Sequence, residues 1–321
     1  MINTAVVILN WNGLNLLKEF LPSVVKHSSS AKIYLADNAS TDASTAWTIE
    51  NYPQVKIIYL AKNYGYAGGY NQALKEVEED FCVLLNNDVE VPENWILPLV
   101  EVLKNNEKIA AVQPKIKDYK RPEYFEYAGA AGGLIDYFAY PYCRGRMFNQ
   151  VEKDQGQFEQ EEEIFWASGA CIALKKSVFE KLGGFDEDYF AHMEEIDLCW
   201  RMKNAGFLIY YTPKSEVFHL GGGTLDSLSP RKTFLNFRNS LYNLVKNAPS
   251  RNIYLKIVLR LMLDGLAAIY FLLQLKPSYF WAVLKAHFSF HANFKTMKKK
   301  RNIPTTPPPY FSLRSIIFKK I

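Results

Sequence analysis

The strongest chemical signal in this chain of 321 residues is a carboxylate placed directly after an apolar run. Residues 81–85 read Phe-Cys-Val-Leu-Leu, and Asn86, Asn87 and Asp88 follow. An unbroken apolar run is typical of a strand that is buried on both faces. Open α/β sheets bind ligands at the carboxyl ends of such strands, and a carboxylate there suits Mg²⁺ or Mn²⁺ with its phosphates. We therefore predict that Asp88 binds a divalent metal; its alternative role is to begin a turn.

A second candidate group is a cluster of acids at the start of a predicted helix. Glu194, Glu195 and Asp197 fall within four residues, directly after the aromatic segment 185–193. The simpler interpretation is that they stabilise the helix start by interacting with its dipole. Three acids exceed what capping requires, however, and their mutual repulsion would raise the pKa of one toward the range of a general base.

His219 is the third candidate. It follows a short predicted strand at 216–218 and comes just before the glycines at 221–223. A histidine at a strand end, before glycines that allow close approach, fits a metal ligand that completes the Asp88 site. A lone histidine is more often a satisfied polar residue, and that alternative stays open.

Four predicted strands, each followed by a helix, would position these side chains. The strands are predicted at 5–9, 32–36, 55–60 and 81–85, and the helices at 16–25, after Ser40 or Thr41, at 72–77 and at 92–103. Strands and helices that alternate at this spacing form a parallel sheet with right-handed crossovers, so the strand ends lie along one edge. We therefore expect Asn10, Asp37, Asn63 and Asp88 to converge.

The second half of the chain is less regular. A strand is expected at 110–114, and 129–133 and 152–163 are expected to be loops over the site. These are followed by a predicted strand at 166–174, a helix capped by Ser177 and Glu180, the acid-rich helix ending at Gly206, and short strands at 207–211 and 216–218.

Net charge divides the chain into two regions. The chain carries 38 Lys and Arg against 33 Asp and Glu, but no acid follows Asp264, where ten Lys and Arg remain. Residues 1–264 therefore hold 28 basic against 33 acidic side chains, a net charge of −5. We predict a catalytic domain over 1–247 and a helical, basic region over 248–321. A basic tail rich in aromatic residues points to anionic lipid before nucleic acid, for which no recognisable module is present.

The apolar segment 253–275 carries one narrow polar stripe, because Lys256, Arg260 and Asp264 recur at every fourth residue of a predicted helix. Its longest stretch without a charged residue, 265–275, has 11 residues, well short of the ~20 that span a bilayer. A second aromatic-rich helix is expected at 279–290, and 295–301 contains five basic residues. Two roles fit this pattern equally: peripheral attachment to an anionic membrane, or helix pairing in a homodimer.

The cysteines and the first residues of the chain indicate the cellular compartment in which the protein is expected to work. Cys82, Cys143, Cys171 and Cys199 show no paired metal-ligand spacing and resemble small buried hydrophobes in a reducing environment. The apolar run at 6–9 is too short for a signal peptide and has no basic flank. We expect a cytoplasmic protein, peripheral at the inner face of the cell membrane.

The ordered set of motifs resembles family 2 glycosyltransferases, the inverting group with a GT-A fold, and within it the rhamnosyltransferase-like branch. A dinucleotide-binding fold is disfavoured because Asn-Trp-Asn-Gly at 10–13 replaces the Gly-x-Gly-x-x-Gly that such a fold needs. The motifs occur in the same order as in the family and cover about residues 3–245. They lie at 10–13, 37–42, 63–71, 85–88, 183–190, 194–201 and 219–222. Arg238 and Asn239 resemble a feature near the end of this branch's catalytic domain, where Arg238 would touch a phosphate or form a structural salt bridge.

The resemblance implies specific roles at these positions. Asp37 would bond the nucleotide base, and Asp88 with His219 would bind the metal, Mg²⁺ or Mn²⁺. Glu195 would be the catalytic base, within a group that includes Glu194 and Asp197. The residues expected to bind the nucleotide-sugar are Asn10, Asp37, Asn38, Asn63, Gly65, Gly69, Asn86 and Asn87. Two departures stand out: Asn86 replaces an acid of the family's metal motif, and Glu195 stands where Asp is commoner.

The implied activity is metal-dependent, inverting transfer of a sugar from a nucleotide-sugar. The donor would be dTDP-rhamnose and the acceptor a glycan or a lipid-linked molecule in cell-surface polysaccharide synthesis. Two alternatives remain. A degenerate glycosyltransferase that only binds is suggested by Asn86, and a sugar nucleotidyltransferase would need a basic Gly-rich loop that 10–13 lacks.

Overall fold

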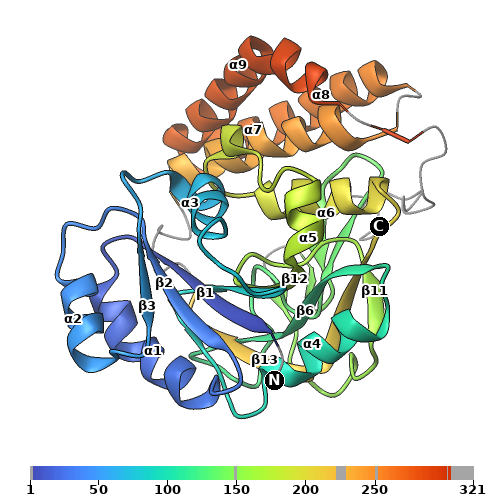
Figure 1. Cartoon of the computed structure of the whole chain (residues 1–321). Helices are drawn as coiled ribbons and strands as arrows, with labels where there is room; N and C mark the ends of the chain where they lie inside the picture. The colour runs from blue at the N-terminus through green and yellow to red at the C-terminus, as the bar shows by residue number, and fades with distance from the viewer. Residues whose placement is uncertain (1–2, 148–149, 222–228, 250–251, 302, 305–321) are drawn as a thin grey trace.

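A nine-stranded mixed sheet forms the centre of the computed structural model, which describes residues 3–147, 150–221, 229–249, 252–301, 303 and 304 (Figure 1). Among these residues the strand order is β11-β13-β6-β12-β4-β1-β2-β3, and β5 pairs with β13. The strands are β1 (Thr4–Asn10), β2 (Lys32–Asp37), β3 (Lys56–Tyr59), β4 (Phe81–Asn86), β5 (Val89–Glu90), β6 (Ile109–Asp118), β11 (Glu162–Ile164), β12 (Cys171–Lys175) and β13 (Leu208–His219).

The first four predicted strands are confirmed, and they pair in parallel as β4-β1-β2-β3. Their ends are level, because Asn10 is in register with Asp37 and Leu9 with Asn86. In the second half, β13 runs parallel to β6, while β12 is antiparallel to both β4 and β6. The predicted α/β fold of GT-A type, with a mainly parallel sheet and helices at the C-terminal end, is confirmed.

Both faces of the sheet are covered, which explains the unbroken apolar runs. Along β1, Val7 packs into one core with α3, α5, α6 and α7, while Val6 and Ile8 pack into a second core with α1 and α4. Residues of β4 alternate in the same way. The helices concerned are α1 (Leu14–His27), α3 (Gly65–Ala73), α4 (Ile96–Asn105), α5 (Lys176–Lys181), α6 (Glu194–Asn204) and α7 (Pro230–Asn247); α2 (Ser44–Asn51) packs beside α1.

A small antiparallel sheet occupies part of the region that the sequence left irregular. Its order is β10-β9-β8-β7, from β7 (Gly133–Ile135), β8 (Pro141–Cys143), β9 (Arg146–Met147) and β10 (Gln150–Val151). The loops predicted at 129–133 and 152–163 are therefore only partly irregular, since Gly133 begins β7 and Glu162 begins β11. Strands of two or three residues are too short to show a periodic pattern.

Several predicted boundaries are wrong, for local reasons. The helix α3 begins at Gly65 and not at Gln72, and α4 begins at Ile96 and not at Pro92. The capping box does not form, because Ser177 lies inside α5 and the residue before the helix, Lys175, makes no side-chain cap. The strands predicted at 207–211 and 216–218 are one strand, β13, whose register shifts between Thr212 and Glu216.

The C-terminal region forms two long helices that pack on the rest of the chain. α8 (Ile253–Leu273) and α9 (Pro277–Lys299) lie with α7 at one end of the molecule, at the top of Figure 1. Arg301 donates to the carbonyls of Val245 and Ala248, so the end of α9 is fixed to the end of α7. None of the helices among the described residues combines the length and apolar character needed to cross a bilayer. The boundary between 247 and 248 stays a prediction.

Candidate active site

Side chains at the ends of β1, β2 and β4 form one hydrogen-bonded group. Asn10 accepts from Asn87 Nδ2 at 2.9 Å and donates to Ser44 Oγ at 3.0 Å. Asn10 is completely buried, so it holds the strand ends together and does not face a ligand in this arrangement. Asp37 accepts from the backbone of Ser40 at 3.2 Å and is nearly buried.

Asn38 extends this group to the end of β3. Its amide donates to Asn63 Oδ1 at 3.2 Å and to the carbonyl of Gly65 at 3.0 Å. Gly65 has a φ of +71°, and a Cβ there would lie 2.6 Å from the carbonyl oxygen of Phe190. Gly69 similarly packs against Leu9. The expected convergence of the strand ends is therefore present, but Gly65 and Gly69 lie on a helix and contact protein.

Asp88, His219 and Glu126 form a buried chain of ionisable groups at the end of β4. Asp88 Oδ1 lies 3.1 Å from His219 Nε2, and Glu126 Oε1 lies 3.3 Å from His219 Nδ1. Burial alone would lower the pKa of His219, but the two carboxylates outweigh it and raise this pKa to about 10. The Asn86 amide lies 3.5 Å from His219 Nε2.

The start of α6 carries two acids with buried, unpaired oxygens. Among the described residues, one carboxylate oxygen of Glu194 and one of Glu195 have no hydrogen-bond partner. Burial raises the pKa of Glu195 to about 7, and burial together with the Glu195 charge raises the pKa of Glu194 well above its usual range. Burial is thus the larger cause, ahead of the repulsion that the sequence suggested. Glu195 remains partly exposed, whereas Glu194 is buried.

The segment before α6 has an unusual backbone that α7 stabilises. Phe190, His192 and Met193 have φ of 64°, 68° and 73°, a region that residues other than glycine rarely adopt. Asn239 Nδ2 donates to the carbonyls of Tyr189, Ala191 and His192, the last at 2.7 Å. α7 therefore fixes the direction in which the acids enter the site.

Asp197 has different surroundings from its two neighbours. It accepts from Arg201 Nε, Lys246 Nζ and Asn247 Nδ2, each at 2.8 Å, and it is completely buried. Burial would raise its pKa, but Lys246 and Arg201 outweigh burial and lower this pKa well below the usual range. Asp197 is thus an ionised anchor between α6 and α7, and it has no opening to a substrate.

Backbone contacts connect the metal-ligand candidates to the acids. The backbone N–H of Asn86 donates to the carbonyl of Ala170 at 3.0 Å. The adjacent carbonyl of Gly169 accepts from the Tyr66 hydroxyl at 2.8 Å. The Tyr66 amide donates to Phe190 at 2.9 Å. The charges of Glu126 and Glu195 also both act on the buried thiol of Cys143, whose pKa burial raises to about 11. These backbone contacts connect the end of β4 to the segment that precedes α6.

Comparison with known proteins decides the family. The sequence model of the family described as "Glycosyl transferase family 2" matches residues 5–183, more than half of the chain. The chain belongs to glycosyl transferase family 2. It is accordingly a glycosyltransferase, and its relatives place it among the rhamnosyltransferase-like members, as the motifs predicted.

Two relatives illustrate what this glycosyltransferase is similar to. N-acetylglucosaminyl-diphospho-decaprenol L-rhamnosyltransferase of Mycobacterium tuberculosis is 28% identical over 222 residues, 63% of this chain and 71% of the relative. Rhamnosyltransferase WbbL of Escherichia coli K12 is 22% identical over 163 residues, 49% of this chain and 61% of the relative. Transferase activity in polysaccharide or glycolipid synthesis follows from these matches.

Solved structures support the fold. The mannosyltransferase PcManGT of Pyrobaculum calidifontis, in complex with GDP-Man and Mn²⁺, has a TM-score of 0.57 at 14% identity, covering 90% of this chain and 87% of that one. GalNAc-T7 with UDP, GalNAc and Mn²⁺ has a TM-score of 0.59 at 18% identity, covering 76% of this chain and 48% of that one. Both neighbours contain a nucleotide and Mn²⁺.

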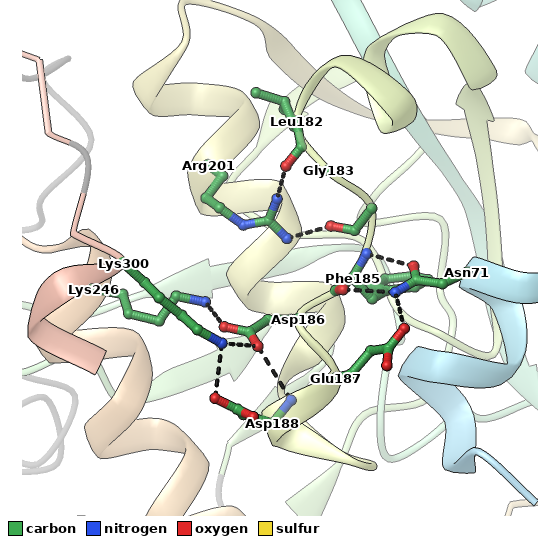
Figure 2. Close-up of a pocket in the computed structure, with 11 residues that line it drawn as sticks. Asn71, Leu182, Gly183, Phe185, Asp186, Glu187, Asp188, Arg201, Lys246 and Lys300 are labelled. Atoms are coloured by element: carbon green, nitrogen blue, oxygen red, sulfur yellow. Dashed lines mark hydrogen bonds and ion pairs between the residues drawn. The ribbon is translucent and has the colours of Figure 1, made fainter. Parts of the chain in front are cut away.

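A cavity of 410 Å³ in this glycosyltransferase lies apart from Asp88 and Glu195; it is lined by residues 182–188 with Asn71, Arg201, Lys246 and Lys300 (Figure 2). Lys246 and Lys300 each lie 2.6 Å from Asp186. Arg201 donates to the carbonyls of Leu182 and Gly184. Since these charged groups already have partners, the cavity is a structural junction between α6, α7 and α9.

Sequence reasoning missed three residues of the site. Glu126 lies in the irregular region, where no periodic pattern marks it. His192 has a ring nitrogen without a hydrogen-bond partner among the described residues, and burial, with the Lys232 charge, lowers its pKa to about 4. Asn239 was noticed only as the neighbour of Arg238. Arg238 donates to the carbonyls of Asp188 and Tyr189 and to Asn239 Oδ1.

Proposed function

We propose that this glycosyltransferase is metal-dependent and inverting, and that it uses a nucleotide-sugar donor. The observation that carries the proposal is that the chain contains both a buried Asp88–His219 contact and a partly exposed Glu195 whose pKa is about 7. A general base works best when its pKa is near the operating pH. The names of the rhamnosyltransferase relatives make dTDP-rhamnose the first donor to test.

The donor set at Asp88 fits Mg²⁺ or Mn²⁺. Among the described residues, no three His, Cys, Asp or Glu side chains gather as a ready-made metal cluster. Asp88 and His219 supply one carboxylate and one imidazole, and ions of this kind usually complete their coordination with waters and substrate phosphates. Glu126 Oε1 lies 3.3 Å from His219 Nδ1, and a hydrogen bond formed there on metal binding would orient the imidazole ring of His219.

The chain's own residues then divide the work. A bound divalent cation would neutralise the diphosphate leaving group of the donor. Glu195 accepts the proton of the acceptor hydroxyl, which attacks the anomeric carbon from the side opposite the nucleotide and inverts its configuration. Asp37 and Asn63 at the strand ends would contact the nucleotide.

The acceptor is proposed to be a glycan or a lipid-linked molecule. The relative named a diphospho-decaprenol rhamnosyltransferase supports a lipid-linked acceptor. Such an acceptor is embedded in a membrane, so we also propose that the protein works in the cytoplasm at the inner face of the cell membrane.

Calorimetry with Mn²⁺ and a panel of nucleotide-sugars tests the proposal. Wild-type protein should bind one donor only when Mn²⁺ is present, and Asp88→Ala should abolish that binding. Glu126→Gln should keep donor selectivity but weaken Mn²⁺ binding by about 10–100-fold. Donor binding that is equally tight without metal, or that survives Asp88→Ala, would contradict the metal site.

A further inference from the structure

The helix α8 is inverted: its charged residues are inside and its apolar residues are outside. Its buried residues are Lys256, Ile257, Arg260, Asp264 and Ala268, so three of the five are charged. Every exposed residue of α8 is aliphatic or aromatic. The apolar face, as we define it, consists of Leu255, Leu259, Met262, Leu266, Ile269 and Leu273, which are spaced three or four residues apart on one side of the helix.

The polar stripe holds α8 in this orientation. Arg260 donates to the carbonyl of Phe138 at 2.9 Å and to Ser240 Oγ at 2.8 Å, and it pairs with Asp264 at 3.1 Å. The hydroxyl of Tyr140 donates to Asp264 at 2.8 Å. Rotating the helix to hide its leucines would break all of these buried contacts, each of which is costly to lose. The apolar face is therefore a fixed outer surface of this fold.

α9 packs against α8 and carries exposed aromatic and basic side chains. Trp281 and Phe288 are exposed on α9, as are Lys285, Lys295 and Lys299. Lys298 Nζ donates to the Tyr254 hydroxyl at 2.9 Å, so the basic end of α9 lies beside the first turn of α8. From residue 265 to the end of the sequence there is no acid. The exposed charged side chains of α8 and α9 are thus all basic.

We propose that the apolar face is a docking surface for an anionic lipid bilayer, into which it inserts to the depth of the interface. An apolar helix face with exposed aromatic residues and a basic border is the arrangement that binds negatively charged lipid surfaces. A second copy of the chain would bring two borders of equal positive charge together, which disfavours a symmetric dimer. The proposal deepens the lipid-linked acceptor of the proposed function, because it names the surface that reaches the membrane.

The surface is rigidly connected to the acid-bearing segment. Lys300, directly after α9, pairs with Asp186 at 2.6 Å and with Asp188 at 2.8 Å, and Asp186 also pairs with Lys246 of α7 (Figure 2). The same α7 holds the carbonyls that precede Glu194. Docking through α8 therefore fixes the orientation of Glu195 relative to the membrane plane.

The test is vesicle flotation of the full chain with a charge-matched pair of variants. The docking variant carries Leu255→Glu, Met262→Glu and Leu266→Glu, at side chains that are 57%, 63% and 63% exposed. The control carries Ile49→Glu, Tyr59→Glu and Leu97→Glu, at positions 48%, 67% and 43% exposed and away from α8 and α9. Because all six positions are exposed, both variants should fold, which circular dichroism checks.

Wild type and control should float with vesicles of phosphatidylcholine and phosphatidylglycerol, and the docking variant should lose binding by about tenfold or more. Wild-type binding should weaken on phosphatidylcholine alone and in high salt. The proposal is overturned if wild type stays unbound, if it binds neutral vesicles equally well, or if both variants float alike.

The apolar face could instead be covered by a second copy of the chain. That outcome would be shown by a wild type that is dimeric and does not bind vesicles, together with a docking variant that is monomeric. Donor binding measured by calorimetry is expected to be the same in all three proteins, so a failure here leaves the glycosyl-transfer proposal separately testable.

Discussion

The buried acids at the start of α6 and on the inner face of α8 differ in their partners. At α6, Glu194 and Glu195 each keep a buried oxygen without a hydrogen-bond partner among the described residues. On α8, Asp264 Oδ2 also has no hydrogen-bond partner among the described residues, but Asp264 has a counter-ion: Oδ1 accepts from Arg260 and from the Tyr140 hydroxyl, and His287 lies 3.6 Å from Oδ2. Paired buried charge fixes the position of an element, whereas an unpaired buried acid destabilises the fold unless a ligand makes use of it. In the proposed mechanism, this contrast separates the residues that do chemistry from those that position them.

The largest effect on activity is expected from Glu195→Gln. The amide keeps the shape of the side chain but cannot accept the acceptor's proton, so kcat should fall by about 10²–10⁴-fold while donor binding stays nearly unchanged. Steady-state kinetics and calorimetry measure the two quantities. Glu180→Gln, at an exposed position of α5, is the control and should leave kcat as it is. Near-normal turnover of Glu195→Gln would remove Glu195 from the role of base.

The largest effect on stability is expected from Asp264→Asn. This change leaves Arg260 charged and buried without its counter-ion, so the free energy of unfolding should fall by about 3–5 kcal/mol. Asp188→Asn breaks only a surface pair with Lys300, in which the Asp188 side chain is 48% exposed, and should cost under about 1 kcal/mol. Denaturant unfolding compares the two. Equal losses would mean that α8 is not held by its polar stripe.

Asp197→Asn tests whether a paired buried acid and an acid without a counter-ion behave differently within a single helix turn. Asp197 lies two residues from Glu195 but is paired with Lys246 and Arg201, so it should behave like Asp264. We expect a loss of about 3 kcal/mol in unfolding free energy and a much smaller fall in kcat than for Glu195→Gln. Full stability with abolished turnover would instead place Asp197 among the catalytic acids.

The smallest effect is a dependence on pH. The folded-state pKa of Glu195, about 7, lies above its ordinary value of 4.5, so the native state binds this proton more tightly than the unfolded chain. The resulting stability is fully present below pH 4.5 and is lost as pH rises through 7. Between these limits wild type should lose about 1–3 kcal/mol relative to Glu195→Gln. Over the same window kcat/KM should rise with pH, and a flat profile would argue against an ionised carboxylate as the base.

The sequence predicted features that follow from periodicity and strand order. The four strand ends, the acids of α6 and the fold class could be read because apolar runs and their polar ends repeat at fixed spacing. Glu126 could not be found, because it approaches His219 only through the folding of an irregular segment. The sequence also could not predict which face of α8 is buried. The stripe of Lys256, Arg260 and Asp264 shows that one face is polar, but only the packing on Phe138, Tyr140 and Ser240 shows that this face points inward.

The contact between Gly65 and Phe190 ties together parts of the chain that are 125 positions apart in the sequence. The amides of Tyr66 and Ala67 both donate to the carbonyl of Phe190, and a methyl group at position 65 would meet that same oxygen at 2.6 Å. A hybrid protein that joined the first half of this chain to the second half of a relative would have to inherit both sides of this contact together. Any substitution that adds a side chain at position 65 would therefore displace the backbone that leads into Glu194 and Glu195.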